Sequence, residues 1–250
     1  MKIGFLSDIH EDVESLQKAI LLLEKAACNE LVCLGDITGF SVDTHKYIDT
    51  RNANECISIV RSNCSIVIPG NHDLYSVKRI PQFTKGFNYP INWYDLAFDE
   101  REEKADQQIW LYEKHDLSAL LSKKNNIYLI SLEEFQKAEF DGLQILFSHY
   151  AFPDLSGSTT QFISHQNQLK EHFNFQQMNK CSLSFSGHRH VEGCTIASSS
   201  SFIKTGFEKI KINSQDTLWI DGPAICRSKK QNGIIIFDTK YMEIQCIMIS

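Results

Sequence analysis

Short apolar runs alternate with segments of helical periodicity over the first 70 residues of the chain. Residues 2–7 form an apolar run that predicts a buried strand, and apolar positions at helical spacing over residues 15–28 predict a helix. A second apolar run, residues 31–34, ends at Gly35. A strand, a helix and a strand of these lengths predict a βαβ unit, in which the two strands lie parallel with a right-handed crossover.

The pattern then repeats once and changes. Residues 54–62 predict a helix and residues 65–68 a third strand, followed by a loop-rich and helical excursion at about 74–125, with a helix at 108–122. Beyond this point the apolar runs are short and closely spaced. The strands they predict are 127–130, 135–140, 143–147, 182–185, 193–197, 201–204, 207–212, 217–220, 233–237 and 243–249. We therefore expect two packed sheets with helices outside them.

Composition narrows the class of protein. The chain is 42% hydrophobic and 22% charged, which is ordinary for a globular protein, and its formal net charge of -6 disfavours a broad electrostatic grip on nucleic acid. It contains no apolar run of about 20 residues, and its first residues do not resemble a signal peptide. None of the eight cysteines stands in a CxxC spacing. Reduced cysteines and a cytoplasmic location are the expectation.

Side chains suited to metal binding follow nearly every predicted strand. In chain order they are Asp8, His10, Asp36, Asn71, His149, His188 and His190. The carboxyl ends of strands are where α/β sheets build their sites, so we expect these residues to converge. Carboxylate, amide and imidazole groups together suit two divalent cations.

The spacing of these residues suggests how each can act. Side chains two apart on an extended segment point the same way, so Asp8 and His10 can bind one cation, while His188 and His190 can reach two adjacent cations. Asp36, on a neighbouring strand, can bridge both cations with its two oxygens. The Asn71 carbonyl oxygen and the lone His149 would complete the set.

Two cations about 3.5–4 Å apart are an arrangement that cleaves phosphoric esters. A bridging hydroxide would attack the phosphorus, and His72, beside Asn71, would assist the leaving group. Asp73 would hold the His72 ring in one tautomer. Arg189 would clamp the substrate phosphate in a bidentate fork, with Asn71 also contacting the substrate.

The order Asp-x-His, Gly-Asp, Gly-Asn-His-Asp, lone His and Gly-His-x-His resembles the calcineurin-like metallophosphoesterase family over essentially the full chain. Gly35–Phe40 and Asn54–Ile57 resemble its bacterial branch of predicted phosphodiesterases and diadenosine-tetraphosphatase-like proteins. The Gly-Asp block lacks the Asp-Arg-Gly continuation of the serine/threonine protein phosphatases, which disfavours that activity.

This resemblance implies an α/β fold, a four-layer α/β/β/α sandwich of two mixed β-sheets flanked by helices, in a single metallophosphoesterase domain over residues 1–250. It implies two metal ions and His72 as the catalytic histidine. The implied ligands are Asp8, His10, Asp36 and His190 for one ion, and Asp36, Asn71, His149 and His188 for the other. Manganese is the first expectation from the family, with iron, zinc, nickel and magnesium as alternatives.

The substrates that we expect are small phosphorylated molecules: phosphomonoesters, phosphodiesters or dinucleoside polyphosphates. Two other functions remain open, a non-catalytic scaffold that keeps the fold and a nuclease. No membrane partner is expected, nucleic acid is disfavoured, and the sequence does not indicate the oligomeric state. The remaining histidines are assigned to surface or packing roles, although two of them can approach the pocket from the polar stretch after His149. These two are His165 and His172, and the others are His45 and His115.

Overall fold

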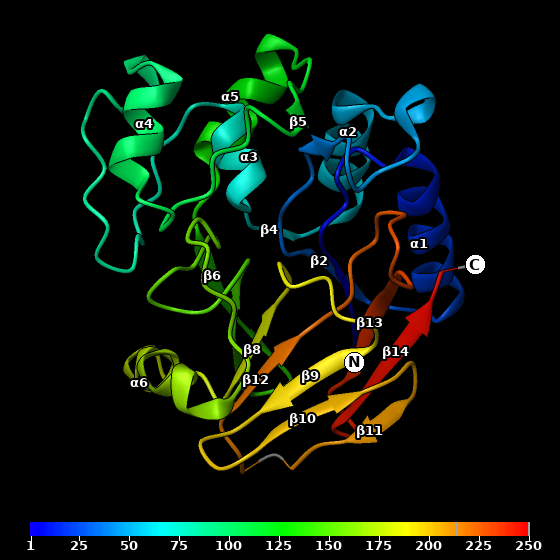
Figure 1. The fold of residues 1–250 in the computed structure, drawn as a ribbon. Coiled ribbons are helices and arrows are strands. Elements are labelled where there is room, and N and C mark those ends of the chain that lie inside the picture. The colour runs from blue at the N-terminus through cyan, green and yellow to red at the C-terminus, as the bar shows by residue number, and fades with distance from the viewer. Residues whose placement is uncertain (214, 250) are drawn as a thin grey trace.

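The computed structural model describes residues 1–213 and 215–249, and in this part of the chain two six-stranded sheets pack against each other (Figure 1). The first sheet has the order β11-β14-β13-β1-β2-β4. Its strands are β1 (Lys2–Leu6), β2 (Glu30–Cys33), β4 (Ile66–Val67), β11 (Lys209–Lys211), β13 (Gly233–Asp238) and β14 (Glu243–Met248). The second sheet has the order β10-β9-β12-β8-β7-β6. Its strands are β6 (Phe135–Phe140), β7 (Leu143–Ser148), β8 (Leu183–Ser186), β9 (Cys194–Ala197), β10 (Phe202–Thr205) and β12 (Leu218–Asp221).

Both sheets are mixed. In the first, β1, β2 and β4 are parallel, and β13 joins β1 antiparallel. In the second, β7, β8 and β12 are parallel, and the other pairs are antiparallel. The predicted parallel pairing of the first two strands is therefore confirmed. The parallel strands matter most for function, because their carboxyl ends carry the candidate ligands.

Residues 1–213 and 215–249 contain six α-helices, of which α4 packs in a separate cluster within the excursion. They are α1 (Val13–Lys25), α2 (Ala53–Asn63), α3 (Asn71–Ser76), α4 (Phe98–Ala105), α5 (Lys123–Ser131) and α6 (Lys170–Met178). Side chains of α1, α2 and α5 share one buried cluster with β1, β2 and β13, whereas the chain around α6 packs against Trp219 of β12. The expected α/β/β/α layering is confirmed.

Strand alternation divides the core between these layers. Along β13, Ile234 and Ile236 face the helices, while Ile235 and Phe237 face the second sheet. Phe5 of β1 stacks on Phe185 of β8 with ring centroids 4.1 Å apart, directly between the sheets. Both faces of β13 are buried, which explains why its sequence is a continuous apolar run rather than an alternating one.

Two predictions were wrong, one within the excursion and one directly after it. Residues 127–130 lie in α5 rather than in a strand, because the Ser122 side chain accepts the Asn125 N–H and starts a helix there. Residues 108–122 are largely irregular rather than helical. Their backbone groups bond to distant segments, as in the Trp110 N–H bond to the Ser158 carbonyl and the pairing of β5 (Asp116–Leu117) with β3 (Phe40–Ser41). Tertiary hydrogen bonds override local periodicity here.

Three helices were not anticipated from the sequence. The Asn-His-Asp block itself begins α3, and the charge run at residues 100–104 lies in α4. α6 lies in the polar stretch that follows His149. All eight cysteines are unpaired, as expected. No helix in residues 1–213 and 215–249 is both long and apolar enough to cross a membrane.

Candidate metal centre

The predicted ligands follow the carboxyl ends of the parallel strands of both sheets, and several lie on unusual backbone. Asp8, His10, Asp36, His188 and His190 have φ values of 53°, 48°, 52°, 72° and 48°. Residues other than glycine rarely adopt this left-handed region, and each such residue costs about 1–3 kcal/mol. Strain of this kind concentrates at functional sites. Here it turns the side chains out of the strand direction and toward one another.

The first group of side chains joins β1 to the turn after β8. His190 Nε2 lies 3.1 Å from Asp8 Oδ1 and 3.2 Å from His10 Nε2. His10 Nε2 is also 3.8 Å from Asp36 Oδ2. His10 Nδ1 lies 2.7 Å from the Gly39 carbonyl oxygen and donates to it, so the Nε2 lone pair faces the group. One carboxylate and two imidazoles thus converge, with Asp36 at their edge.

The second group lies on the other side of Asp36. His149 Nε2 is 3.2 Å from Asp36 Oδ2, and His149 Nδ1 donates to the Leu34 carbonyl oxygen at 2.7 Å. His188 Nδ1 is 3.1 Å from Asn71 Oδ1. One ligand atom each from Asp36, His149 and His188 lie within 4.8 Å of one another. All four residues are buried.

These groups fit divalent cations. Nε2 of His188 is buried and, among the described residues, has no partner in hydrogen-bond geometry. A buried polar atom without a partner costs free energy, and a bound cation would remove that cost. Asp36 reaches both groups, as expected for a carboxylate that two ions share.

Charges within the site are strongly coupled. Burial opposes ionisation of Asp8 and Asp36, yet His190 beside Asp8 and His149 beside Asp36 hold the pKa of both carboxyls below its usual range. Burial lowers the pKa of His188 to about 3, whereas Asp36 overcomes burial and raises the pKa of His149 to about 10. A protonated His149 therefore supplies positive charge between two carboxylates where a cation would otherwise do so.

His72 points into the site from the start of α3, but its partner is not the predicted one. His72 Nδ1 lies 2.7 Å from Asp116 Oδ2, and the Asp116 side chain is 5% exposed. Despite burial, Asp36 and Asp116 raise the pKa of His72 to about 9. The backbone N–H of His72 also donates to Asp36 Oδ1 at 2.9 Å. No sequence pattern indicates Asp116, because β5 reaches the site through pairing with β3 rather than through a local motif.

The prediction that Asp73 holds the His72 ring was wrong. The Asp73 carboxylate accepts the backbone N–H groups of Thr38 at 2.9 Å and of Gly70 at 3.0 Å. It also accepts from the Thr38 hydroxyl at 3.0 Å. Asp73 therefore ties the loop after β2 to the start of α3, which positions Asp36 and His72 from behind.

The prediction that Arg189 binds substrate phosphate was also wrong. Its guanidinium turns away from the metal ligands and lies 2.7 Å from Asp221 Oδ2, with further bonds to the Ile163 carbonyl and the Thr195 hydroxyl. It also lies over the Trp219 ring, 5.1 Å from the centroid. Arg189 stands between His188 and His190, which both have positive φ values. Its side chain points away from the side chains of these two histidines and anchors the turn after β8 to the second sheet.

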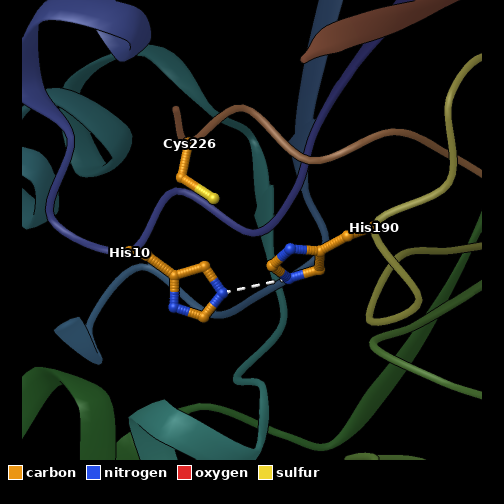
Figure 2. A group of neighbouring side chains, drawn as sticks. All are labelled: His10, His190 and Cys226. Atoms are coloured by element: carbon orange, nitrogen blue, oxygen red, sulfur yellow. Dashed lines mark hydrogen bonds between the residues drawn. The ribbon is translucent and has the colours of Figure 1, made fainter. Parts of the chain in front are cut away.

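Other residues reach the site without a sequence signal. Asn71 Nδ2 donates to the Tyr112 hydroxyl at 2.9 Å, which turns the Asn71 oxygen toward His188. The His45 ring lies 5.0 Å from that of His10. Cys226 also lies close to His10 and forms, with His10 and His190, a further group of possible ligands (Figure 2).

An open pocket of about 260 Å³ leads to the metal ligands. Its wall combines the ligands with His45, His115 and aromatic residues of two loops, among them Trp110 and Phe162, whose ring centroids are 6.0 Å apart. His165 and His172 keep the surface and packing roles assigned to them and do not approach the pocket, since His172 is a buried residue of α6 and His165 is exposed outside the pocket wall. His45 and His115, which were assigned to the same roles, line the pocket instead.

Two glycines permit the ligands to meet. A Cβ at Gly187 would overlap the Ser7 hydroxyl and the Asp8 carboxylate, and a Cβ at Gly70 would overlap the Asp36 carboxylate. The turns after β4 and β8 therefore approach the aspartates more closely than any side chain would allow. This accounts physically for the Gly-Asn-His and Gly-His-x-His patterns of the sequence.

Comparison with known proteins agrees with this arrangement. The family model of the calcineurin-like phosphoesterases matches residues 1–192. The structure resembles a metallophosphoesterase from Sphaerobacter thermophilus with a TM-score of 0.65 at 18% identity, covering 100% of this chain and 88% of that one. A hypothetical protein from Pyrococcus horikoshii gives 0.61 at 10% identity, with the same shares of 100% and 88%. At these identities the likeness shows the fold alone.

One curated relative, an uncharacterized protein of Methanocaldococcus jannaschii, is 26% identical over 166 residues, 61% of this chain. The match spans 54% of that relative, about half its length. The family model defines the class of protein, the calcineurin-like phosphoesterases. The chain belongs to this family.

Proposed function

We propose that this chain hydrolyses small phosphoric esters with two divalent cations held around Asp36. The observation that carries the proposal is the position of Asp36 between two ligand groups, one with Asp8, His10 and His190 and the other with Asn71, His149 and His188. The buried Nε2 atom of His188, which has no hydrogen-bond partner among the described residues, supports it. A scaffold protein would have no need for this donor set or for its backbone strain.

Divalent cations in such a site lower the pKa of water and offset the charge of the phosphate. The protein itself contributes by orienting the side chains that would bind the cations. The Gly39 and Leu34 carbonyl oxygens accept from Nδ1 of His10 and of His149, so that Nε2 of each ring is the atom left to bind a cation. Tyr112 orients the Asn71 amide.

His72 is the group that assists departure of the leaving oxygen. It lines the pocket, its side chain is 16% exposed, and Asp116 lies against the opposite ring nitrogen. Nδ1 is thus held by the carboxylate, and Nε2 is the ring atom left to deliver a proton to the substrate. Asp116 acts through His72 as a positioning residue.

The substrate class is inferred from the pocket. A volume of about 260 Å³ suits a small phosphorylated molecule or part of a nucleotide, and its aromatic wall offers faces for a base. Phosphomonoesters, phosphodiesters and dinucleoside polyphosphates remain the classes to test. Manganese is the first cation to test, with iron, zinc, nickel and magnesium as alternatives. The unpaired cysteines support a reducing, cytoplasmic location.

The test is reconstitution of the metal-free protein with each cation, followed by assay on chromogenic phosphoesters, cyclic nucleotides and diadenosine tetraphosphate. We expect cation-dependent turnover of at least one class. Absence of turnover with every cation, in protein shown to bind two ions per chain, would contradict the proposal. The control is Glu243→Ala, which removes the ion pair with Lys209 away from the pocket. It shows whether a substitution and the metal-removal procedure alone change the turnover.

A further inference from the structure

Cys226 lies behind the first ligand group. Its sulfur and one ring nitrogen each of His10 and His190 are all within 4.8 Å of one another. Figure 2 shows the Cys226 side chain directed toward the space between the two imidazole rings. No other cysteine belongs to such a group among residues 1–213 and 215–249.

The position of this sulfur is fixed by the backbone. The Ile225 N–H donates to the Ser7 carbonyl at 2.9 Å, and the Cys226 N–H donates to the Asp8 carbonyl at 3.0 Å. The segment after β12 therefore runs directly alongside the end of β1, where the ligands Asp8 and His10 begin. Cys226 is 0% exposed, so its thiol is surrounded by protein and does not contact solvent.

The distances suit ligands of a single cation. Two histidine nitrogens bound to one tetrahedral zinc ion, at about 2.0–2.1 Å each, lie about 3.3 Å apart, and the Nε2 atoms of His10 and His190 are 3.2 Å apart. A zinc–thiolate bond of about 2.3 Å at a tetrahedral angle places the sulfur about 3.6 Å from each nitrogen. Since the sulfur already lies within 4.8 Å of both nitrogens, a shift of at most about 1.2 Å brings it into bonding distance.

The side from which the sulfur approaches also matters. His10 and His190 line the open pocket, whereas Cys226 does not and packs with Phe40, Tyr47 and Ala224. A sulfur ligand would therefore come from the protein interior and leave the pocket side of the cation free for substrate.

We propose that Cys226 is a thiolate ligand of the cation bound by His10 and His190, and that it makes this position prefer zinc or ferrous iron to manganese or magnesium. The proposal rests on the proposed function, because it takes the same cation site as given. On binding, the thiol proton passes to solvent and the sulfur lone pair forms the bond to the cation. Thiolate favours borderline and soft ions over hard ones such as magnesium and manganese, which favours zinc over manganese at this position only.

The decisive measurement is X-ray absorption at the zinc edge of the full chain loaded with two zinc ions. Wild-type protein should show sulfur scattering at about 2.3 Å, equivalent to one sulfur for every two zinc ions. Cys226→Ser should lose that signal while keeping its fold by circular dichroism. Cys56→Ser, which alters a buried cysteine of α2 outside these groups, should retain it.

A competition experiment gives the second readout. In Cys226→Ser, manganese should displace one of the two zinc ions about 10- to 100-fold more readily than in wild type, the usual effect of losing a group that tunes a metal site. If the manganese concentration needed to displace one zinc ion were the same for Cys226→Ser and wild type, the inference would be overturned.

The two proposals fail in different ways. Wild-type protein that binds two zinc ions and hydrolyses phosphoesters but shows no sulfur scattering would overturn the Cys226 assignment and leave the proposed function intact. Wild-type protein that binds two manganese ions but no zinc would likewise overturn only the Cys226 assignment, whereas protein that binds no divalent cation would overturn both.

Discussion

At the scale of single residues, the centre depends on side chains whose orientation is fixed from behind. Backbone carbonyls of Gly39 and Leu34 accept from Nδ1 of His10 and of His149, and the Tyr112 hydroxyl sets the Asn71 amide. Such partners keep ligand atoms directed at a cation before it binds, which lowers the cost of reorganisation. The sequence identifies the ligands but not these partners, since a carbonyl oxygen has no signature and Tyr112 lies in an irregular segment.

The His72–Asp116 pair allows a test of the leaving-group assignment. His72→Ala should reduce kcat by about 100- to 10,000-fold, the contribution of a positioned acid, with metal content unchanged. Asp116→Asn should reduce kcat by about 10- to 100-fold, because the ring keeps its place but loses its anionic partner. Steady-state kinetics and elemental analysis measure both.

Asp43→Asn is the matched control, since Asp43 forms an exposed pair with His115 at 2.6 Å. It should leave kcat unchanged. Equal losses in Asp43→Asn and Asp116→Asn would show that the Asp116 contact has no specific role.

Arg189 allows a second test at this scale. Asp221→Ala leaves the buried guanidinium without its carboxylate and should lower the free energy of unfolding by about 3–5 kcal/mol. Glu243→Ala removes the exposed partner of Lys209 and should cost no more than about 1 kcal/mol. Denaturant unfolding at pH 8 measures both, above the value of about 7 to which burial raises the pKa of Asp221. Similar losses in the two variants would contradict the anchoring role of Arg189.

At the scale of elements, the parallel strands are what bring the ligands together. β1, β2 and β4 end beside one another in the first sheet, and β7 and β8 do so in the second. These strands were predictable because each is an apolar run that ends in glycine or a polar residue. The structure of the excursion was not predictable from the sequence, because β5 and the segment around Trp110 are held by hydrogen bonds to residues 40–42 and 158–160. Patterns within a window of the sequence carry no information on such contacts.

α6 provides a prediction on stability at low pH. His172 lies on the buried face of this helix, accepts the Phe152 N–H at Nδ1 and donates from Nε2 to Ser184, and burial lowers its pKa to about 3. Between pH 6.5 and about 3 the unfolded chain binds a proton at His172 that the folded chain does not. This group therefore makes stability fall as the pH falls, by about 1.4 kcal/mol per unit.

His172→Gln should remove that slope. The difference in unfolding free energy between wild type and variant, measured on metal-free protein, should shrink by about 1.4 kcal/mol for each unit from pH 6 to pH 4. Parallel curves for the two proteins would rule out a neutral, buried His172 in the fold.

At the scale of the whole molecule, two sheets from distant parts of the chain build one site. Asp8 and Asp36 come from the first sheet, and His149, His188 and His190 from the second, so the centre forms only when the sheets pack. The layered fold was predictable from the order of motifs along the chain, and so was the set of side chains that the structure brings together. The roles of Asp73 and Arg189 were not, because a residue beside a ligand in sequence can point away from it in space.

Asp36 is the side chain on which the account depends, so its replacement is the most direct test. The measurement is the number of metal ions per chain, by elemental analysis of protein loaded with manganese or zinc and by anomalous scattering from crystals. Wild-type protein should hold two ions, and Asp36→Ala one or none, with turnover abolished. An Asp36→Ala protein that still binds two ions would contradict a centre built around this shared carboxylate.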